Sequence, residues 1–148
     1  MIFYGTYRFH HGAHRPFITA WVMSSQGEWV KASFLVDTGA DETFLPQRSI
    51  AILGIDTSGL DVRTDASGVG GTGVPYFQWQ SQLLLKSPGG QRRLFGGEIN
   101  VFLGPHAIRF PVLGRDVLDH FVVVFDRESN QVLLIGKPDG YKLVRAEQ

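Results

Sequence analysis

Residues 34–44 join an apolar run to a single carboxylate, Asp37, which is followed at once by a turn of small residues. The apolar residues at 35–36 predict a buried strand, so Asp37 should emerge at the end of that strand and face a cavity. Gly39 lets the backbone approach a neighbouring chain closely and frees the following amides to point at the carboxylate. Thr38 adds a hydroxyl that can bond a nearby backbone group. An aspartate on an ordinary surface loop would not need a buried strand before it or a Thr-Gly turn after it.

Two further segments follow this turn along the chain. Residues 67–73 are dense in glycine. Within residues 110–118, two apolar residues are followed directly by a glycine and an arginine. Together with the Asp-Thr-Gly-Ala-Asp sequence at 37–41, these segments resemble the flap, the closing segment and the active-site turn of retropepsin-like aspartic proteases. The resemblance covers about residues 15–135. The alternative is that Asp37 only caps a turn in a β-sandwich.

The resemblance implies an all-β chain, folded as a closed or partly open β-barrel of the retropepsin-like acid protease type. One or two short helices and one lobe per chain are part of this expectation. The length of 148 residues fits a single domain with one core. We therefore expect one protease domain over residues 1–148, with its core at about 15–135. The N-terminal strand within 1–14 and the tail at 136–148 would be extensions.

Apolar patterning and turn residues divide the chain into many short elements. The predicted strands cover residues 2–9, 16–24, 28–36, 43–45, 61–64, 76–86, 92–103, 108–113, 121–125 and 131–135. Short helices are predicted at 46–53 and 115–120, and residues 141–144 could form one more strand. The sequence leaves open whether the first strand pairs within its own subunit or across a dimer.

The overall composition excludes several kinds of partner. Fourteen basic and fourteen acidic side chains cancel, so neither a nucleic-acid partner nor a membrane surface is indicated. The chain contains no cysteine, which excludes disulfides and thiolate metal sites. There is no signal-like leader and no apolar run of membrane-spanning length, so we expect a cytoplasmic protein.

Three histidines near the N-terminus, His10, His11 and His14, raise the alternative of a metal site. His10 and His14 would share a face only in a helix, and Gly12 with Pro16 argues against a helix. A solvated turn fits this segment better, so no metal is expected.

The glycine-dense segment has four possible interpretations: a linker, a phosphate loop, a plain turn or a flap. One small core has no need of an internal linker, and no Lys-Ser/Thr pair or helix follows for a phosphate loop. A hairpin tip that must lie against another backbone accounts for so many glycines better than a plain turn does. The flap and substrate-binding residues are then Gly68, Val69, Gly70, Gly71, Thr72 and Gly73.

The single Asp-Thr-Gly sequence determines the expected oligomeric state. Aspartic protease chemistry uses two carboxyl groups that share one proton: one accepts a proton from the attacking water, and the other polarises the substrate carbonyl. Because this sequence has one such aspartate and no internal repeat, the resemblance implies a homodimer with one Asp37 from each subunit.

The resemblance also assigns supporting roles around Asp37. Thr38 would bond across the dimer axis, Gly39 would present its carbonyl to the substrate, and Asp41 would contact substrate backbone or pair with Arg115. The alternative for Arg115 is a surface arginine on a short helix. Ala40 has no hydroxyl to donate to the dyad, which should raise the dyad pKa and give a weakly acidic working range.

The predicted function is that of an aspartic endopeptidase acting on extended polypeptide. A cleft walled by Leu35, Val69, Val74 and Val112 should prefer apolar residues at the cut, and no cofactor is needed because the dyad uses only water. One alternative is a non-catalytic protease-like dimer that binds peptide or serves as an assembly module. Another is an all-β ligand-binding domain unrelated to proteases.

Overall fold

The structure is a computed structural model that describes residues 1–65, 73–105, 107–137 and 144. These residues form a nine-stranded sheet and two short helices, and nine of the ten predicted strands are present at least in part. The strands are β1 (Ile2–His10), β2 (Ala13–Met23), β3 (Trp29–Val36), β4 (Phe44–Leu45), β5 (Tyr76–Lys86), β6 (Arg92–Phe102), β7 (Val112–Leu113), β8 (Phe121–Asp126) and β9 (Gln131–Gly136). The helices are α1 (Ser49–Leu53) and α2 (Arg115–Leu118). No helix among the described residues is long and apolar enough to cross a membrane.

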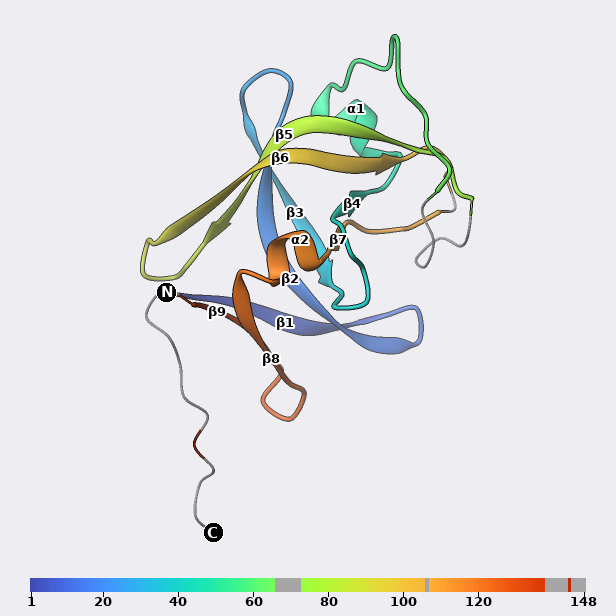
Figure 1. The fold of residues 1–148 in the computed structure, drawn as a ribbon. Coiled ribbons are helices and arrows are strands. Elements are labelled where there is room, and N and C mark those ends of the chain that lie inside the picture. The colour runs from blue at the N-terminus through green and yellow to red at the C-terminus, as the bar shows by residue number, and fades with distance from the viewer. Residues whose placement is uncertain (66–72, 106, 138–143, 145–148) are drawn as a thin grey trace.

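Most of the strands close into a ring. The order β3-β7-β4-β6-β5-β2 is completed by the pairing of β2 with β3 (Figure 1). The β5–β6 hairpin is the longest ladder, and it arches over the part of the ring that contains β4 and β7. The ring is built mainly from antiparallel pairs, but β7 pairs in parallel with β3, and β4 pairs in parallel with β6. The expected all-β, partly open barrel is therefore confirmed.

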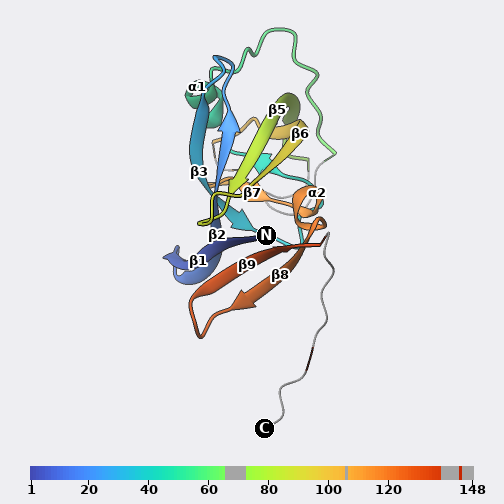
Figure 2. The same ribbon diagram turned by 90° about the vertical axis from the view of Figure 1, so that its left-hand side faces the viewer.

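The remaining strands extend the sheet away from the ring in the order β1-β9-β8 (Figure 2). The first part of β1 pairs with β9, for example Phe3 with Leu134, and the second part pairs with β2, for example Arg8 with Arg15. Within this single chain, β1 therefore has two partner strands, β9 and β2. The predicted closing hairpin is present as β8 and β9.

Alternation of apolar residues explains why these segments become strands. Along β2 the side chains of Ile18, Ala20 and Val22 are buried, whereas the residues between them are partly exposed. The main core is filled by such inward-facing residues from the ring and from the extension β1-β9-β8, including Phe3, Phe34, Phe77, Val101 and Leu134. Burying this apolar surface is the main stabilising contribution to the fold.

The histidine-rich segment lies at the hairpin between β1 and β2. His11 and Gly12 both have positive φ angles, 49° and 79°, as a tight two-residue hairpin requires. The predicted turn is therefore present, and the segment is not helical. Among the described residues, no group of three or more His, Cys, Asp or Glu side chains could hold a metal ion.

Several predicted elements are shorter than expected, among them the helix predicted at 115–120, which ends at Leu118. Residues 61–64 form only one bridge, between Arg63 and Tyr76, and the strand expected at 108–113 is confined to β7. Helix α1 begins at Ser49, because the residues after Pro46 form the preceding turn, and it ends at Gly54 in the left-handed conformation. The tail predicted at 141–144 lies outside the described residues except for residue 144.

Candidate active site

Asp37 is positioned by the end of β3, where this strand pairs in parallel with the buried strand β7. It directly follows β3, whose residues Leu35 and Val36 pair with Val112 and Leu113 of β7. The Asp37 N–H donates to the carbonyl oxygen of Leu113 at 3.2 Å and extends this ladder by one bond. The backbone of Asp37 is therefore fixed by β7, and its carboxylate projects from the end of β3.

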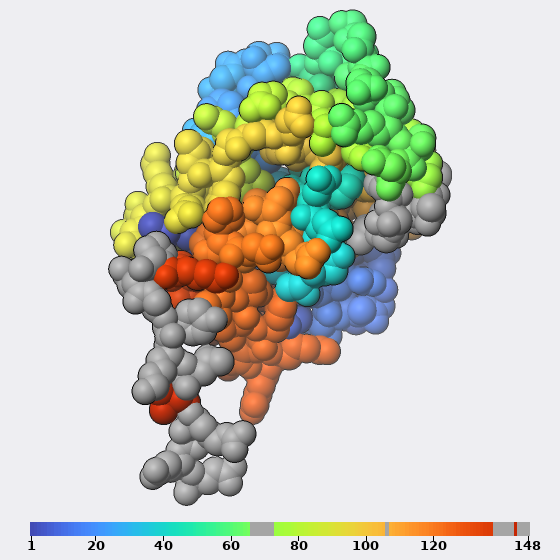
Figure 3. Space-filling model, viewed as in Figure 1, coloured from blue at the N-terminus to red at the C-terminus, as the bar shows by residue number. Residues whose placement is uncertain are grey.

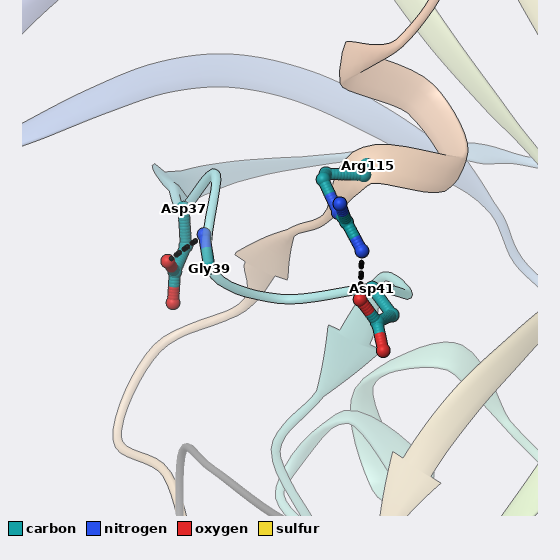
Figure 4. Close-up of polar contacts among 4 residues, drawn as sticks. All are labelled: Asp37, Gly39, Asp41 and Arg115. Carbon is teal, nitrogen blue, oxygen red and sulfur yellow. Dashed lines mark hydrogen bonds and ion pairs between the residues drawn. The ribbon is translucent and has the colours of Figure 1, made fainter.

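The turn after Asp37 folds back toward the carboxylate (Figure 4). The Gly39 N–H donates to Asp37 Oδ1 at 2.9 Å, and the Ala40 N–H donates to the Asp37 carbonyl at 3.2 Å. A Cβ atom at Gly39 would lie 3.2 Å from Oδ1, which is tight, so glycine suits this position. Asp37 is half-buried, whereas Thr38 and Gly39 are exposed. The tip of the turn is thus open to a second molecule.

The far side of the same loop rests on α2. Arg115 forms an ion pair with Asp41, as Figure 4 shows, with side-chain exposures of 50% and 80%. Such an exposed pair contributes at most about 1 kcal/mol to stability. The backbone contributes more: the Arg115 N–H donates to the Ala40 carbonyl at 2.8 Å, and the Asp116 N–H donates to the Asp41 carbonyl at 3.1 Å. In Figure 3 the loop and α2 lie side by side at the surface, below β6.

Two polar residues that sequence reasoning missed complete this support. Thr43 is 2% exposed, and its hydroxyl donates to Asp116 Oδ1 at 2.7 Å and accepts from the Gly114 N–H at 3.2 Å. The Thr43 N–H donates to Asp116 Oδ2 at 2.9 Å. A carboxylate directly after Gly-Arg was the available signal, but its partner is distant in the sequence.

Asn100 on β6 anchors the loop from the other side. Its side-chain amide donates to Glu42 Oε2 at 2.9 Å and to the Thr43 carbonyl at 3.2 Å. Asn100 is 2% exposed, so its polar atoms are withdrawn from water. The loop that carries Asp37 is therefore held both by α2 and by β6.

Replacing Thr43 by Val should lower the free energy of unfolding by about 1–3 kcal/mol, because two bonds of a buried hydroxyl are lost at nearly constant volume. Chemical denaturation monitored by circular dichroism measures this change. Thr6→Val, at an exposed position of β1, is the matched control and should change stability by less than about 0.5 kcal/mol. Equal effects of the two substitutions would refute the role given to Thr43.

Apolar residues line the region next to Asp37. A second small core contains Tyr76, Phe102, Ile108 and Val112, and partly buried residues pack against it. These partly buried residues are Leu35, Ala40, Phe44, Val74 and Ala107. Three residues of the predicted cleft wall therefore gather in one cluster next to the turn, and the fourth, Val69, lies outside the described residues.

Of the predicted flap residues, Gly68 to Thr72 lie outside the described residues. Gly73 has a φ angle of 77°. The chain before this segment and the chain after it are joined by hydrogen bonds. Arg63 and Tyr76 exchange backbone hydrogen bonds at 2.8 and 2.9 Å, and the Tyr76 hydroxyl donates to Asp65 Oδ1 at 2.5 Å.

This last hydrogen bond lowers the pKa of Asp65 and raises the pKa of Tyr76. A carboxyl whose pKa is lowered by folding stabilises the folded state above its unfolded pKa, near 3.9, and loses that contribution as the pH falls through its folded pKa. Tyr76→Phe should therefore raise the Asp65 pKa toward its usual value. The stability difference between the variant and the unmodified protein should shrink in acid.

Carboxyl titration by NMR measures the Asp65 pKa in both proteins. An Asp65 pKa that is the same with and without the Tyr76 hydroxyl would contradict this assignment. Asp56, whose pKa is lowered by bonds from Ser58, should titrate identically in both proteins and serves as the internal control.

Comparisons with known proteins bear on the family and the fold of this chain. Residues 20–83 match a family model described as aspartyl protease. The chain is similar to the crystal structure of a retropepsin-like aspartic protease from Rickettsia conorii, with 19% identity, a TM-score of 0.60 and 90% of each chain covered. No curated protein matches the chain in sequence.

Two more distant structures also match. The EIAV protease complexed with the inhibitor HBY-793 has 21% identity and a TM-score of 0.44 over 76% of this chain and 92% of that chain. The retroviral protease-like domain of Ddi1 from Leishmania major has 17% identity and a TM-score of 0.42 over 83% and 95%. We base the fold assignment on the Rickettsia structure. The chain thus has the fold of the retropepsin-like aspartic proteases, and residues 20–83 match the aspartyl protease family.

Proposed function

We propose that this protein is an aspartic endopeptidase that is active as a homodimer, with one Asp37 from each subunit. The observation that carries this proposal is the half-buried Asp37 on an open turn. The backbone of this turn is held by hydrogen bonds to Leu113 and Arg115. A carboxyl group held in this way can meet a second carboxyl without reorganising the loop that carries it.

The second carboxyl group comes from a second copy of the chain. A two-fold axis next to the exposed residues Thr38 and Gly39 brings identical turns together in an isologous contact. Two carboxylates about 3 Å apart cannot both ionise, so one pKa falls and the other rises, as in the known example of the pepsin dyad. The ionised carboxylate takes a proton from water, and the protonated carboxyl group donates to the substrate carbonyl oxygen.

The neighbours of Asp37 take supporting roles in this proposal. Thr38 bonds across the axis and locks the two turns, and Gly39 presents its carbonyl to the substrate. Asp41, held by Arg115, borders the substrate backbone. Ala40 offers the dyad no hydroxyl, which favours a weakly acidic working range.

The substrate is an extended polypeptide that lies between the dyad and the flap residues 68–73. Backbone hydrogen bonds to an extended peptide supply affinity, and side-chain pockets on alternating sides supply selectivity. The apolar residues beside the turn, such as Leu35 and Val112, favour apolar side chains at the cut.

A non-catalytic dimer that binds peptide or serves as an assembly module is the alternative function, since the same turn could hold a peptide without cutting it. Incubation with a mixed peptide library at several pH values, read by mass spectrometry, distinguishes the two. Internal cleavage next to apolar residues supports the endopeptidase. Peptide binding without cleavage at every pH supports the alternative.

A further inference from the structure

A cavity lies away from the Asp37 turn, between α1, β3 and the hairpin of β1 and β2. Its volume is about 350 Å³, which is within the range of small-molecule sites. In Figure 2 α1, β3 and β1 follow one another down one side of the molecule. None of the residues 37–44 lines this cavity, so a ligand bound there would not depend on the proposed protease chemistry.

The charges around this cavity all have the same sign. Its lining contains four cationic side chains and no acidic one: Arg8, Lys31, Arg48 and Arg109. Among the described residues the only ion pairs are Arg63–Asp61 and Arg115–Asp41. The four cations therefore have no carboxylate partner in the described part of the chain, although basic and acidic residues balance overall.

Two residues of the cavity lining also carry a buried polar atom without a hydrogen-bond partner in the described part of the chain. Ser33 Oγ and His10 Nδ1 are buried atoms that make no hydrogen bond within the described residues. Buried polar atoms in proteins nearly always have a partner, and each such exception calls for an explanation. Both atoms lie beneath the cavity surface, so a ligand would reach them only after a local movement of the lining.

The other walls of the cavity are apolar and aromatic. Phe17 and Phe110 contact each other edge to face with ring centroids 5.3 Å apart, and the His10 ring lies 5.1 Å from Phe110. Ile52 of α1 lines the same cavity and is a large apolar residue that is 58% exposed. The cavity thus offers an apolar surface beside its cations.

The edge of β3 that borders the cavity has backbone N–H and C=O groups that no other strand pairs with in the described part of the chain. β3 pairs with β2 over residues 29–35, but on its other side it pairs with β7 only at Leu35 and Val36. Residues 30–33 therefore have one unpaired edge in the described part of the chain, and these residues line the cavity. An unpaired strand edge presents N–H donors in addition to the side-chain cations.

We propose that this cavity binds a small organic oxyanion, in which a phosphate or carboxylate group is joined to an aromatic or apolar body. Guanidinium groups bind both kinds of oxyanion through charge-assisted, often bidentate hydrogen bonds. Backbone N–H groups on the unpaired edge of residues 30–33 add polar contacts, and Phe17 and Phe110 contact the apolar body.

A neighbouring histidine is consistent with the positive potential of this region. Partial desolvation and then the charges of Arg109, His10 and Arg15 lower the pKa of His11. An Arg109 guanidinium nitrogen lies 3.0 Å from His11 Nε2, which is the contact expected if that ring nitrogen is neutral and accepts the bond.

Isothermal titration calorimetry with phenyl phosphate, benzoate and neutral benzyl alcohol tests the proposal. Phenyl phosphate or benzoate should bind at one site per chain with a dissociation constant below about 1 mM, which is modest for a small ligand. Benzyl alcohol should bind at least tenfold more weakly. The order of the two anions distinguishes a site for a phosphate monoester from one for a carboxylate.

The double variant Arg8→Gln/Lys31→Gln should weaken anion binding at least tenfold. Neither side chain forms an ion pair among the described residues, so the fold should tolerate the change. The control Arg92→Gln/Arg127→Gln removes the same charge from exposed residues outside this cavity and should leave binding within twofold. NMR shift changes on binding should map to residues 30–33 and 109–111.

Three results would overturn the proposal: no saturable binding of either anion, equal weakening in both double variants, or shift changes centred on the Asp37 turn. The first would mean that the cavity takes no such ligand, and the second that only net charge matters. Because the readout is binding, none of these results depends on whether the protein hydrolyses peptides.

Discussion

Replacing Asp37 by Asn should lower the rate of peptide hydrolysis by roughly a thousandfold or more, the scale seen when a catalytic group is removed from a hydrolase. An amide cannot take a proton from water or share one with a second carboxyl group. In a homodimer the substitution removes both members of the dyad at once. The rate is measured on a peptide that the unmodified protein cleaves in the library experiment.

The same substitution should leave the fold intact. The Gly39 N–H donates to Asp37 Oδ1, and an asparagine carbonyl can accept that bond in the same place. Asp119→Asn, at an exposed position just after α2, is the matched control and should retain activity within twofold. Unchanged hydrolysis by folded Asp37→Asn protein would remove the proposed catalytic role.

Gly114→Ala should destabilise the protein by about 3 kcal/mol, because overpacking at a rigid site has a large cost. A Cβ atom at position 114 would lie 2.3 Å from the carbonyl oxygen of Glu42 and 2.8 Å from its nitrogen. Both are backbone atoms of the loop that carries Asp37, so relief requires that the loop move. The φ angle of Gly114 is −97°, which any residue can adopt, so the effect is purely steric.

Thermal unfolding should report this change as a loss of roughly 10 °C in Tm for a chain of this length. Activity should fall more than stability alone explains, because the displaced loop also carries the proposed catalytic group. Gly96→Ala on β6 is the control: its added Cβ meets nothing within 4 Å, so Tm should stay within about 2 °C. Similar Tm values for the two variants would contradict the close packing of the loop on Gly114.

The strands were predictable because local patterns decide them. The long hairpin of β5 and β6 was predicted to within one residue, since alternating side chains and the turn at 87–90 define both strands. Of the strand predicted at 108–113, only Val112 and Leu113 form β7. The chain joins the sheet at Pro111, whose carbonyl accepts a hydrogen bond from the Leu35 N–H. Residues 61–64 have a single bridging partner, which local sequence cannot reveal.

The site was predictable only in part, for a similar reason. The position of Asp37 at the end of a strand follows from a motif of adjacent residues. The pair of Asp41 and Arg115, 74 positions apart, was expected only from the resemblance to retropepsin-like proteases. Thr43 and Asp116 are separated by 73 positions, and their hydrogen bonds exist only because the loop packs on α2. No pattern of spacing could have selected this pair from the other polar residues of the chain.

The central claim is that two chains build one active site, and native mass spectrometry with a statine-type transition-state mimic tests it most directly. We predict one bound inhibitor for every two chains, and no binding to the Asp37→Asn variant. A complex of one inhibitor with one chain, or two inhibitors on each dimer, would contradict a site shared between subunits.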